Sequence, residues 1–342
     1  MPPDYSRYPL WTQIVAIVSV AYGVGVLAFF AARAVDPQAP LIAMLDYLAP
    51  LFFVPLIVLL PLAIVSRSHA ALAMPVVLII LFGLLYGAVY LPRARPAPGV
   101  RSVTFMTFNL QAGVPPPASL IAAIARENPD VVALEELEPY PAGVIRQELE
   151  GQYPYMVMAP LDHDTALLSR YPVVASAWFA PAGTGRAALA ATLDVQGAVW
   201  RVIVAHPQPP HILWRWRGRI PWGIDVTALN AEVADIAQRA ARLEGRTVVL
   251  GDFNMSSGSL AYRNMARVLI DSYLEAGWGL GLTFPHKAHL GVLPLLGPFT
   301  RLDYVFHSAD LYAEQARVGC HEGSDHCYVW VRMGLARAIP QP

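Results

Sequence analysis

Two polar side chains stand two residues apart after a predicted buried strand, Asp252 and Asn254 in the turn Gly251–Asn254. The preceding run, Thr247–Leu250, is short and largely apolar, which is typical of a strand in the core of a sheet. Because residues two apart in an extended chain point the same way, the turn should deliver a carboxylate and an amide into one small volume. A Gly-Asp-x-Asn turn is also an ordinary loop sequence. Its chemistry therefore depends on what else the chain brings to the same place.

Five other segments share this character, since each is an apolar run with polar residues at or beside its end. An enzyme built on a sheet places its chemistry at strand ends. Each side chain taken alone has an ordinary structural explanation, and it is their joint occurrence that indicates a site. The polar residues of the five segments are Asn109, Glu135, Glu136, His206, Asp303, Asp325 and His326.

The combined set predicts a site for a hard divalent cation. Carboxylates and amide oxygens without a cysteine cluster suit Mg²⁺ or Mn²⁺. Two histidines can donate to a phosphoryl oxygen or move protons, and an aspartate can activate water. We therefore expect attack on a phosphodiester or phosphomonoester, in which stabilisation of the transition-state charge contributes most.

From about residue 101 to 333 the sequence resembles the endonuclease/exonuclease/phosphatase superfamily, which includes pancreatic-type deoxyribonucleases, abasic-site endonucleases, neutral sphingomyelinases and inositol polyphosphate phosphatases. No single motif is specific, but all of them in this order are. The resemblance implies an α/β fold: a two-sheet β-sandwich flanked by helices, in four layers. The motifs are Thr107–Asn109, Pro129–Glu136, Leu168–Pro172, His206, Gly251–Asn254, Thr283–Pro285, Arg301–Tyr304 and Ser324–His326.

The resemblance also implies the metal ligands. Glu136 would be the principal metal carboxylate with Asn109 beside it, and Asp325 would contact a second metal. The family motif usually has glutamine before the metal glutamate, where this chain has Glu135. Glu135 would either tune metal affinity or point away. We expect it to point away, because neighbours on a strand face opposite sides.

The same resemblance implies the catalytic roles. Asp252 would orient or deprotonate the attacking water, and Asn254 would hold a phosphate oxygen. His326 would polarise the scissile phosphate, steadied by Asp303 through its other ring nitrogen. His206 would also face the phosphate.

Two further clusters receive no catalytic role. Asp162, His163 and Asp164 match no motif, and we expect them to form a solvated turn before the strand at 166–168. Cys320 and Cys327 either pair or remain buried thiols. We expect free thiols, because Cys327 lies on a predicted core strand.

The first 92 residues form a predicted membrane domain. They carry only six charged side chains, and they contain three apolar segments, at 11–32, 41–65 and 70–91. Each segment exceeds the roughly 20 residues needed to cross a bilayer core, and a cleaved signal peptide would explain only one of them. We therefore expect three transmembrane helices in a bacterial-type plasma membrane. The prolines of the second and third segments should cause kinks, or the second segment is partly re-entrant. Basic residues divide almost evenly between the two sides, so sidedness stays open.

A short Pro/Arg linker at 93–100 should connect the anchor to a catalytic domain at 101–335. That length suffices for one large α/β domain. Helical patterns appear at 118–127, 144–149 and 226–243, the last with the apolar period of an amphipathic helix.

The substrate is constrained by charge and by one unusual segment. The catalytic domain has a formal charge near neutrality, without the basic excess of a protein that grips long duplex DNA. The segment His211–Trp222 interleaves three tryptophans with three arginines. This mixture suits a lipid headgroup region, although it could also stack on single-stranded bases or pack on the domain body. A second apolar loop, Leu290–Pro298, precedes the strand with Asp303.

We therefore expect a lipid-linked phosphodiester, such as a phospholipid or sphingolipid headgroup, as substrate, with the bilayer as the partner surface; no protein partner is inferred. A membrane-anchored nuclease is the alternative. An inactive phosphate-binding scaffold is disfavoured, because Glu136, Asp252 and His326 are all present.

Overall fold

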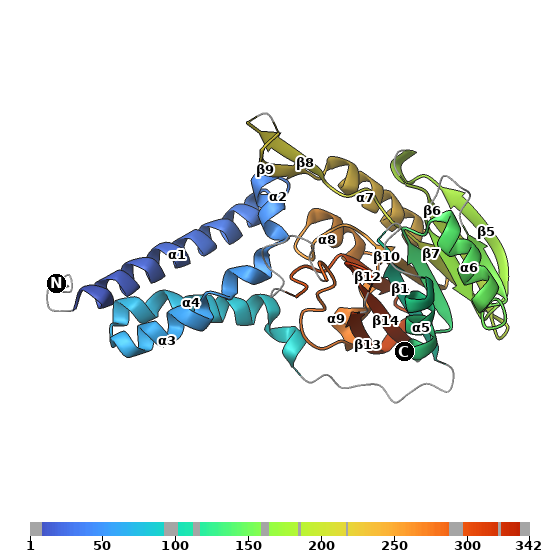
Figure 1. Ribbon diagram of the computed structural model, residues 1–342, viewed down its shortest axis with the longest axis horizontal. Coiled ribbons are helices and arrows are strands. Elements are labelled where there is room, and N and C mark those ends of the chain that lie inside the picture. Colours follow the sequence, from blue (N-terminus) through green and yellow to red (C-terminus); the bar gives the residue numbers. More distant parts are fainter. Residues whose placement is uncertain are drawn as a thin grey trace, which may run out of the picture. The chain divides into compact units, whose positions relative to one another are not determined.

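The protein is described here by a computed structural model, in which the chain forms two compact units (Figure 1). Residues 1–91 and 212–224 form one unit, and residues 92–211 and 225–342 form the other. The predicted linker at 93–100 and residues 290–296 of the second apolar loop lie outside the described residues. The described ranges are 9–91, 102–111, 117–158, 164–183, 186–216, 218–286, 297–320 and 323–335.

The first unit contains three helical stretches that are long and apolar enough to cross a membrane, at 10–35, 49–66 and 69–90. The second predicted segment is broken, with helix starts immediately around Pro50 and Pro55. Proline fits the first turn of a helix but removes a donor from its interior, which accounts for the new helix starts there. The elements are α1 (Leu10–Val35), α2 (Pro40–Asp46), η2 (Ala49–Phe53), α3 (Leu56–Ser66), α4 (His69–Tyr86) and η3 (Gly87–Tyr90).

The helices of this unit pack tightly on one another. A Cβ atom at Gly23 of α1 would lie only 2.7 Å from the side chain of Met74 in α4, so the glycine permits this close approach. The charged residues Arg33 and Asp46 pair at 2.7 Å, which satisfies both at the end of α2. The hairpin of β8 (His211–Arg215) and β9 (Ile220–Asp225) forms a two-stranded sheet of its own.

The second unit contains two six-stranded sheets. The first has the order β13 (Leu311–Cys320), β14 (Cys327–Leu335), β1 (Val103–Asn109), β2 (Val131–Glu135), β4 (Ala166–Ser169), β3 (Tyr155–Met158). The second has the order β11 (Ile270–Asp271), β12 (Asp303–His307), β10 (Arg246–Asp252), β7 (Ala198–Val204), β6 (Ala188–Val195), β5 (Val173–Phe179). The β1–β2 and β10–β7 pairs are parallel, and the other strand pairs of these sheets are antiparallel.

The two sheets pack face to face around one apolar core, where the ring of Phe105 stacks on that of Trp200 at 5.8 Å. Alternate residues of the central strands point outward, where helices cover them. The result is the predicted four-layer α/β sandwich. The first sheet is covered by α5 (Pro117–Glu127) and α6 (Pro139–Leu149), the second by α7 (Thr227–Ala241) and α8 (Leu260–Ala266), and the short elements are η4 (Pro181–Gly183) and α9 (Ser272–Ala276).

Topology brings the polar strand ends to one edge of the sandwich. The strands β1, β2, β7 and β10 all end there, because each parallel pair runs in one direction. Their antiparallel neighbours β12 and β14 begin at the same edge, where Asp303 lies directly opposite Asp252. The fold therefore assembles the predicted site residues from six strands.

Candidate active site

The turn after β10 requires the glycine that precedes Asp252. Gly251 has φ 148°, and a Cβ atom there would lie 1.9 Å from the carbonyl oxygen of Ala205. Only glycine permits this close approach of β10 to the end of β7. Asn254 is left-handed with φ 49°, and its N–H donates to Oδ1 of Asp252 at 2.8 Å. This bond fixes the carboxylate at the strand end.

Two other strand ends, those of β1 and β2, place oxygen-bearing side chains beside Asp252. The amide nitrogen of Asn109 donates to Oδ2 of Asp252 at 2.9 Å and to Oε1 of Glu136 at 3.2 Å. Glu136 directly follows β2 and is left-handed, with φ 54°, so its side chain turns toward this group. Two carboxylates around one amide form a donor set of the kind that a hard divalent cation prefers.

The loop before β14 places Asp325 beside this group. The hydroxyl of Ser324 donates to the carbonyl oxygen of Asn109 at 2.7 Å, and the N–H of Asp325 donates to Oε1 of Gln111 at 3.1 Å. Burial raises the pKa of Asp325, and the negative charge of Glu136 acts in the same direction. A cation near these carboxylates would relieve their mutual repulsion.

His326 and Asp303 form a buried pair, with Nδ1 of His326 2.9 Å from Oδ2 of Asp303. The expected contact between these residues is therefore present. Nε2 of His326 lies 3.8 Å from Asp252, and the ring of Phe284 packs at 4.8 Å. Burial alone lowers the pKa of His326, but the charges of Asp303, Asp252 and Asp325 outweigh it and raise the pKa to about 10.

His206 is held by two residues that the sequence did not indicate. Its Nδ1 lies 3.1 Å from Oδ2 of Asp164, and Nη1 of Arg186 lies 2.7 Å from Nδ1 and 2.6 Å from Nε2. Nε2 also lies 3.7 Å from both Glu136 and Asp252.

The expectation that Asp164 belongs to a solvated turn is thus wrong. In the sequence, only the position of Asp164 just before the apolar strand β4 could have indicated it. Arg186 belongs to none of the motifs. Asp162 and His163 lie outside the described residues.

The expectation that Glu135 points away also fails. It is fully buried, and it accepts from the hydroxyl of Thr107 at 2.8 Å on the face that also carries Asn109. Strand alternation does not apply here, because β2 ends at Glu135 and Glu136 has already left the strand conformation. Burial raises the pKa of Glu135 well above its usual range.

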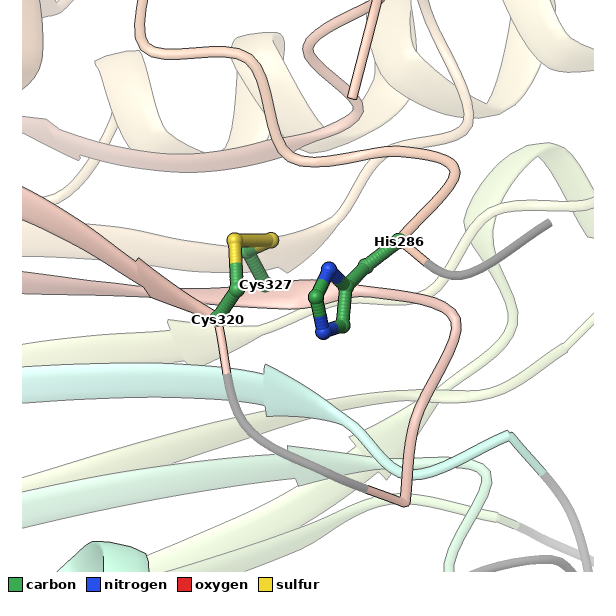
Figure 2. A group of neighbouring side chains, drawn as sticks. All are labelled: His286, Cys320 and Cys327. Carbon is green, nitrogen blue, oxygen red and sulfur yellow. A yellow bond between two sulfur atoms is a disulfide. The ribbon is translucent and has the colours of Figure 1, made fainter. Parts of the chain in front are cut away.

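The cysteines form a disulfide, contrary to the expected free thiols. Cys320 and Cys327 face each other at the end of the β13–β14 pair, so the hairpin brings the sulfurs together. Figure 2 shows His286 beside the disulfide. Ligand atoms of the three residues lie within 4.8 Å of one another, but sulfurs bonded to each other are not thiolate metal ligands. The bridge instead closes the loop that carries Asp325 and His326.

Asn254 completes the site, since its side-chain amide donates to the carbonyl oxygen of Pro207, next to His206, at 3.1 Å. All eight predicted residues therefore lie at one edge of the sandwich. The geometry offers a carboxylate flanked by two imidazoles, with further carboxylate and amide oxygens beside it.

Comparisons with known proteins agree with this fold. The sequence profile of the Endonuclease/Exonuclease/phosphatase family matches residues 106–326, whereas no curated protein matches the chain. A similar solved structure is the endonuclease/exonuclease/phosphatase from Bacteroides vulgatus, with a TM-score of 0.54 and 17% identity, covering 69% of this chain and 100% of that one. A family protein from Leptotrichia buccalis has a TM-score of 0.52 and 20% identity, covering 68% and 100%. D. rerio TDP2, complexed with single strand DNA product, has a TM-score of 0.55 and 14% identity, covering 68% and 99%.

Proposed function

This chain belongs to the endonuclease/exonuclease/phosphatase family, and from that premise we propose that it is a membrane-anchored, divalent-metal-dependent phosphodiesterase acting on lipid-linked phosphodiesters. The observation that carries this proposal is the convergence of Glu136, Asp252 and His326 at one edge of the sandwich. Residues 1–92 would be the anchor, 93–100 the linker and 101–335 the catalytic domain.

Glu136, Asn109 and Asp325 would hold the cation, either Mg²⁺ or Mn²⁺. All three offer oxygen ligands, and no thiolate competes among the described residues at this edge. When bound, the cation would supply Lewis-acid stabilisation of charge on the phosphate. To present its amide oxygen to the metal, Asn109 would turn its side-chain amide, because the nitrogen now faces Glu136 and the oxygen accepts from the N–H of Gln111.

Asp252 would orient the attacking water and accept its proton. It is almost fully buried, with an imidazole on either side at 3.7 and 3.8 Å. His326 would donate to a phosphoryl oxygen from Nε2, because Asp303 holds the opposite ring nitrogen.

Two further groups would bind the phosphate. Asn254 would contribute its amide after releasing Pro207. Nε2 of His206 lies within 3.7 Å of both Glu136 and Asp252, and Asp164 would keep the ring in its present orientation.

Two observations support a lipid-linked substrate over a nucleic acid. Three stretches of the chain are apolar and long enough to cross a bilayer, so the enzyme would work beside lipid. The chain carries a formal charge of −1, whereas binding to long nucleic acid depends on neutralising many phosphates.

A substrate panel in Mg²⁺ tests this proposal, with the full chain in detergent or vesicles. Release of headgroups from phospholipid and sphingolipid vesicles is measured beside nicking of a plasmid. We expect headgroup release by the wild type and its loss in His326→Ala, which controls for contaminating hydrolases. Efficient nicking without headgroup release would establish the nuclease instead. Full activity in His326→Ala would remove the mechanism.

A further inference from the structure

The hairpin β8–β9 is a separate small element of the protein. It is not part of either six-stranded sheet, and its residues 212–224 group with the three apolar helices. A two-stranded hairpin alone is at best marginally stable in water. The hairpin therefore requires packing partners on its faces.

One such partner is the start of α2. Gly223 in β9 is buried, and a Cβ atom there would lie 2.6 Å from the side chain and 2.7 Å from the backbone of Pro40. The backbone of β9 thus rests directly on α2, as Figure 1 shows for these neighbouring elements. The contact lies where the chain turns between the first and second apolar stretches. Because this turn follows the first crossing and η3 follows the third, both lie on the same side of the bilayer.

Much of the hairpin's apolar surface remains uncovered. Ile212 and Trp214 share one face of β8, because they are two residues apart, and they are 44% and 51% exposed. Trp216 at the turn is 79% exposed, and Ile220 at the start of β9 is 51% exposed. Soluble surfaces seldom gather two tryptophans and two isoleucines, and such a patch indicates a binding surface.

The charges of the hairpin fit an anionic surface. The hairpin from His211 to Asp225 has three arginines and one acidic residue, Asp225 at its end. The guanidinium of Arg215 stacks 4.4 Å from the ring of Trp222, an arrangement that keeps an arginine beside an apolar ring. Tryptophan rings and arginine side chains both favour the lipid headgroup region, where rings are buried and guanidinium groups meet phosphates.

We propose that β8–β9 is an interfacial anchor whose Ile212, Trp214, Trp216 and Ile220 enter the headgroup–acyl boundary of the bilayer that the three helices span. Its arginines bind lipid phosphates. In the chain, β8 begins just beyond His206, so the connection between this anchor and a residue of the site is short. This inference rests on the proposed membrane anchoring, and it agrees with the lipid phosphodiester proposed as the substrate class.

Depth-dependent quenching tests the anchor without any measurement of activity. The full chain is reconstituted into vesicles of phosphatidylcholine and phosphatidylglycerol, with or without bromine on the acyl chains near the headgroup. Trp214→Phe/Trp216→Phe is compared with Trp278→Phe, which removes a similarly exposed tryptophan of the other unit. We expect brominated lipid to quench the emission that the double variant removes, and not the emission that the control removes. An unquenched Trp214/Trp216 contribution would overturn the proposal.

A second measurement asks what the anchor does for the enzyme. Trp214→Ser/Trp216→Ser and the control Trp278→Ser are assayed on a vesicle phospholipid and on soluble bis(p-nitrophenyl) phosphate. Loss of two rings that the bilayer buries should raise the apparent KM on vesicles roughly tenfold or more. The KM on the soluble substrate, and both KM values of the control, should not change. Equal losses on both substrates would contradict an anchoring role. A wild type inactive on both would refute the proposed function, while the quenching result still decides the anchor.

Discussion

At the scale of single residues, the charge of Asp303 controls the protonation of His326. Asp303→Asn keeps the shape of the contact at 2.9 Å but removes the charge, so the pKa of His326 should fall from about 10. Activity that needs protonated His326 is present below this pKa and lost above it. The alkaline limb of the kcat profile should therefore move to lower pH, with kcat at neutral pH reduced roughly 10- to 100-fold. An unmoved alkaline limb would show that His326 does not act as a protonated donor.

Glu135 should behave as a neutral residue despite its position next to Glu136. It is fully buried with a raised pKa, and it accepts from Thr107. We expect Glu135→Gln to retain activity and thermal stability, because glutamine keeps the shape and the acceptor. Glu135→Leu should cost about 1–3 kcal/mol of unfolding free energy, because it leaves the Thr107 hydroxyl unsatisfied. The measurement is activation by Mg²⁺, compared between Glu135→Gln and Glu136→Gln. An equal loss of activation in both variants would identify Glu135 as a metal ligand.

At the scale of elements, the disulfide at the end of β13–β14 holds the loop with Asp325 and His326. Replacing both cysteines by serine should cost about 2–3 kcal/mol of unfolding free energy, as expected for a closed loop of this size. The melting temperature should drop by several degrees. Because a looser loop places His326 less accurately, kcat should fall several-fold.

Reduction provides the matched control for this prediction. Dithiothreitol should reproduce both losses in the wild type and change nothing further in Cys320→Ser/Cys327→Ser. Wild-type protein whose activity and melting temperature resist complete reduction, verified by thiol titration, would show that the bridge does not position the loop.

The elements show which parts of the site the sequence could predict. Asn109, Asp252 and Asp303 were predictable, because apolar runs mark strands and polar residues mark their ends. The orientation of Glu135 was not, because it depends on β2 ending one residue before Glu136. The partners of His206 were hidden for a different reason. Asp164 and Arg186 reach it only through tertiary packing, from segments 42 and 20 residues away in the chain. Likewise, the disulfide depends on strand register.

At the scale of the whole molecule, the disulfide bears on which side of a membrane the proposed anchor would place the unit that contains the site. Basic residues did not decide this, but disulfides form and persist in oxidising compartments and are rare in the cytosol. We therefore predict that the unit containing Cys320 and Cys327 faces away from the cytoplasm. With three crossings, the turn at Arg67 between α3 and α4 then faces the cytoplasm.

Paired reporter fusions in a bacterial host measure this topology. Alkaline phosphatase matures only after export, whereas green fluorescent protein exported unfolded stays dark. Fused after Pro342, the phosphatase should be active and the fluorescent protein dark, and fusions at Arg67 should give the opposite pattern. A fluorescent carboxyl-terminal fusion would place the catalytic unit in the cytoplasm, where this disulfide would not persist.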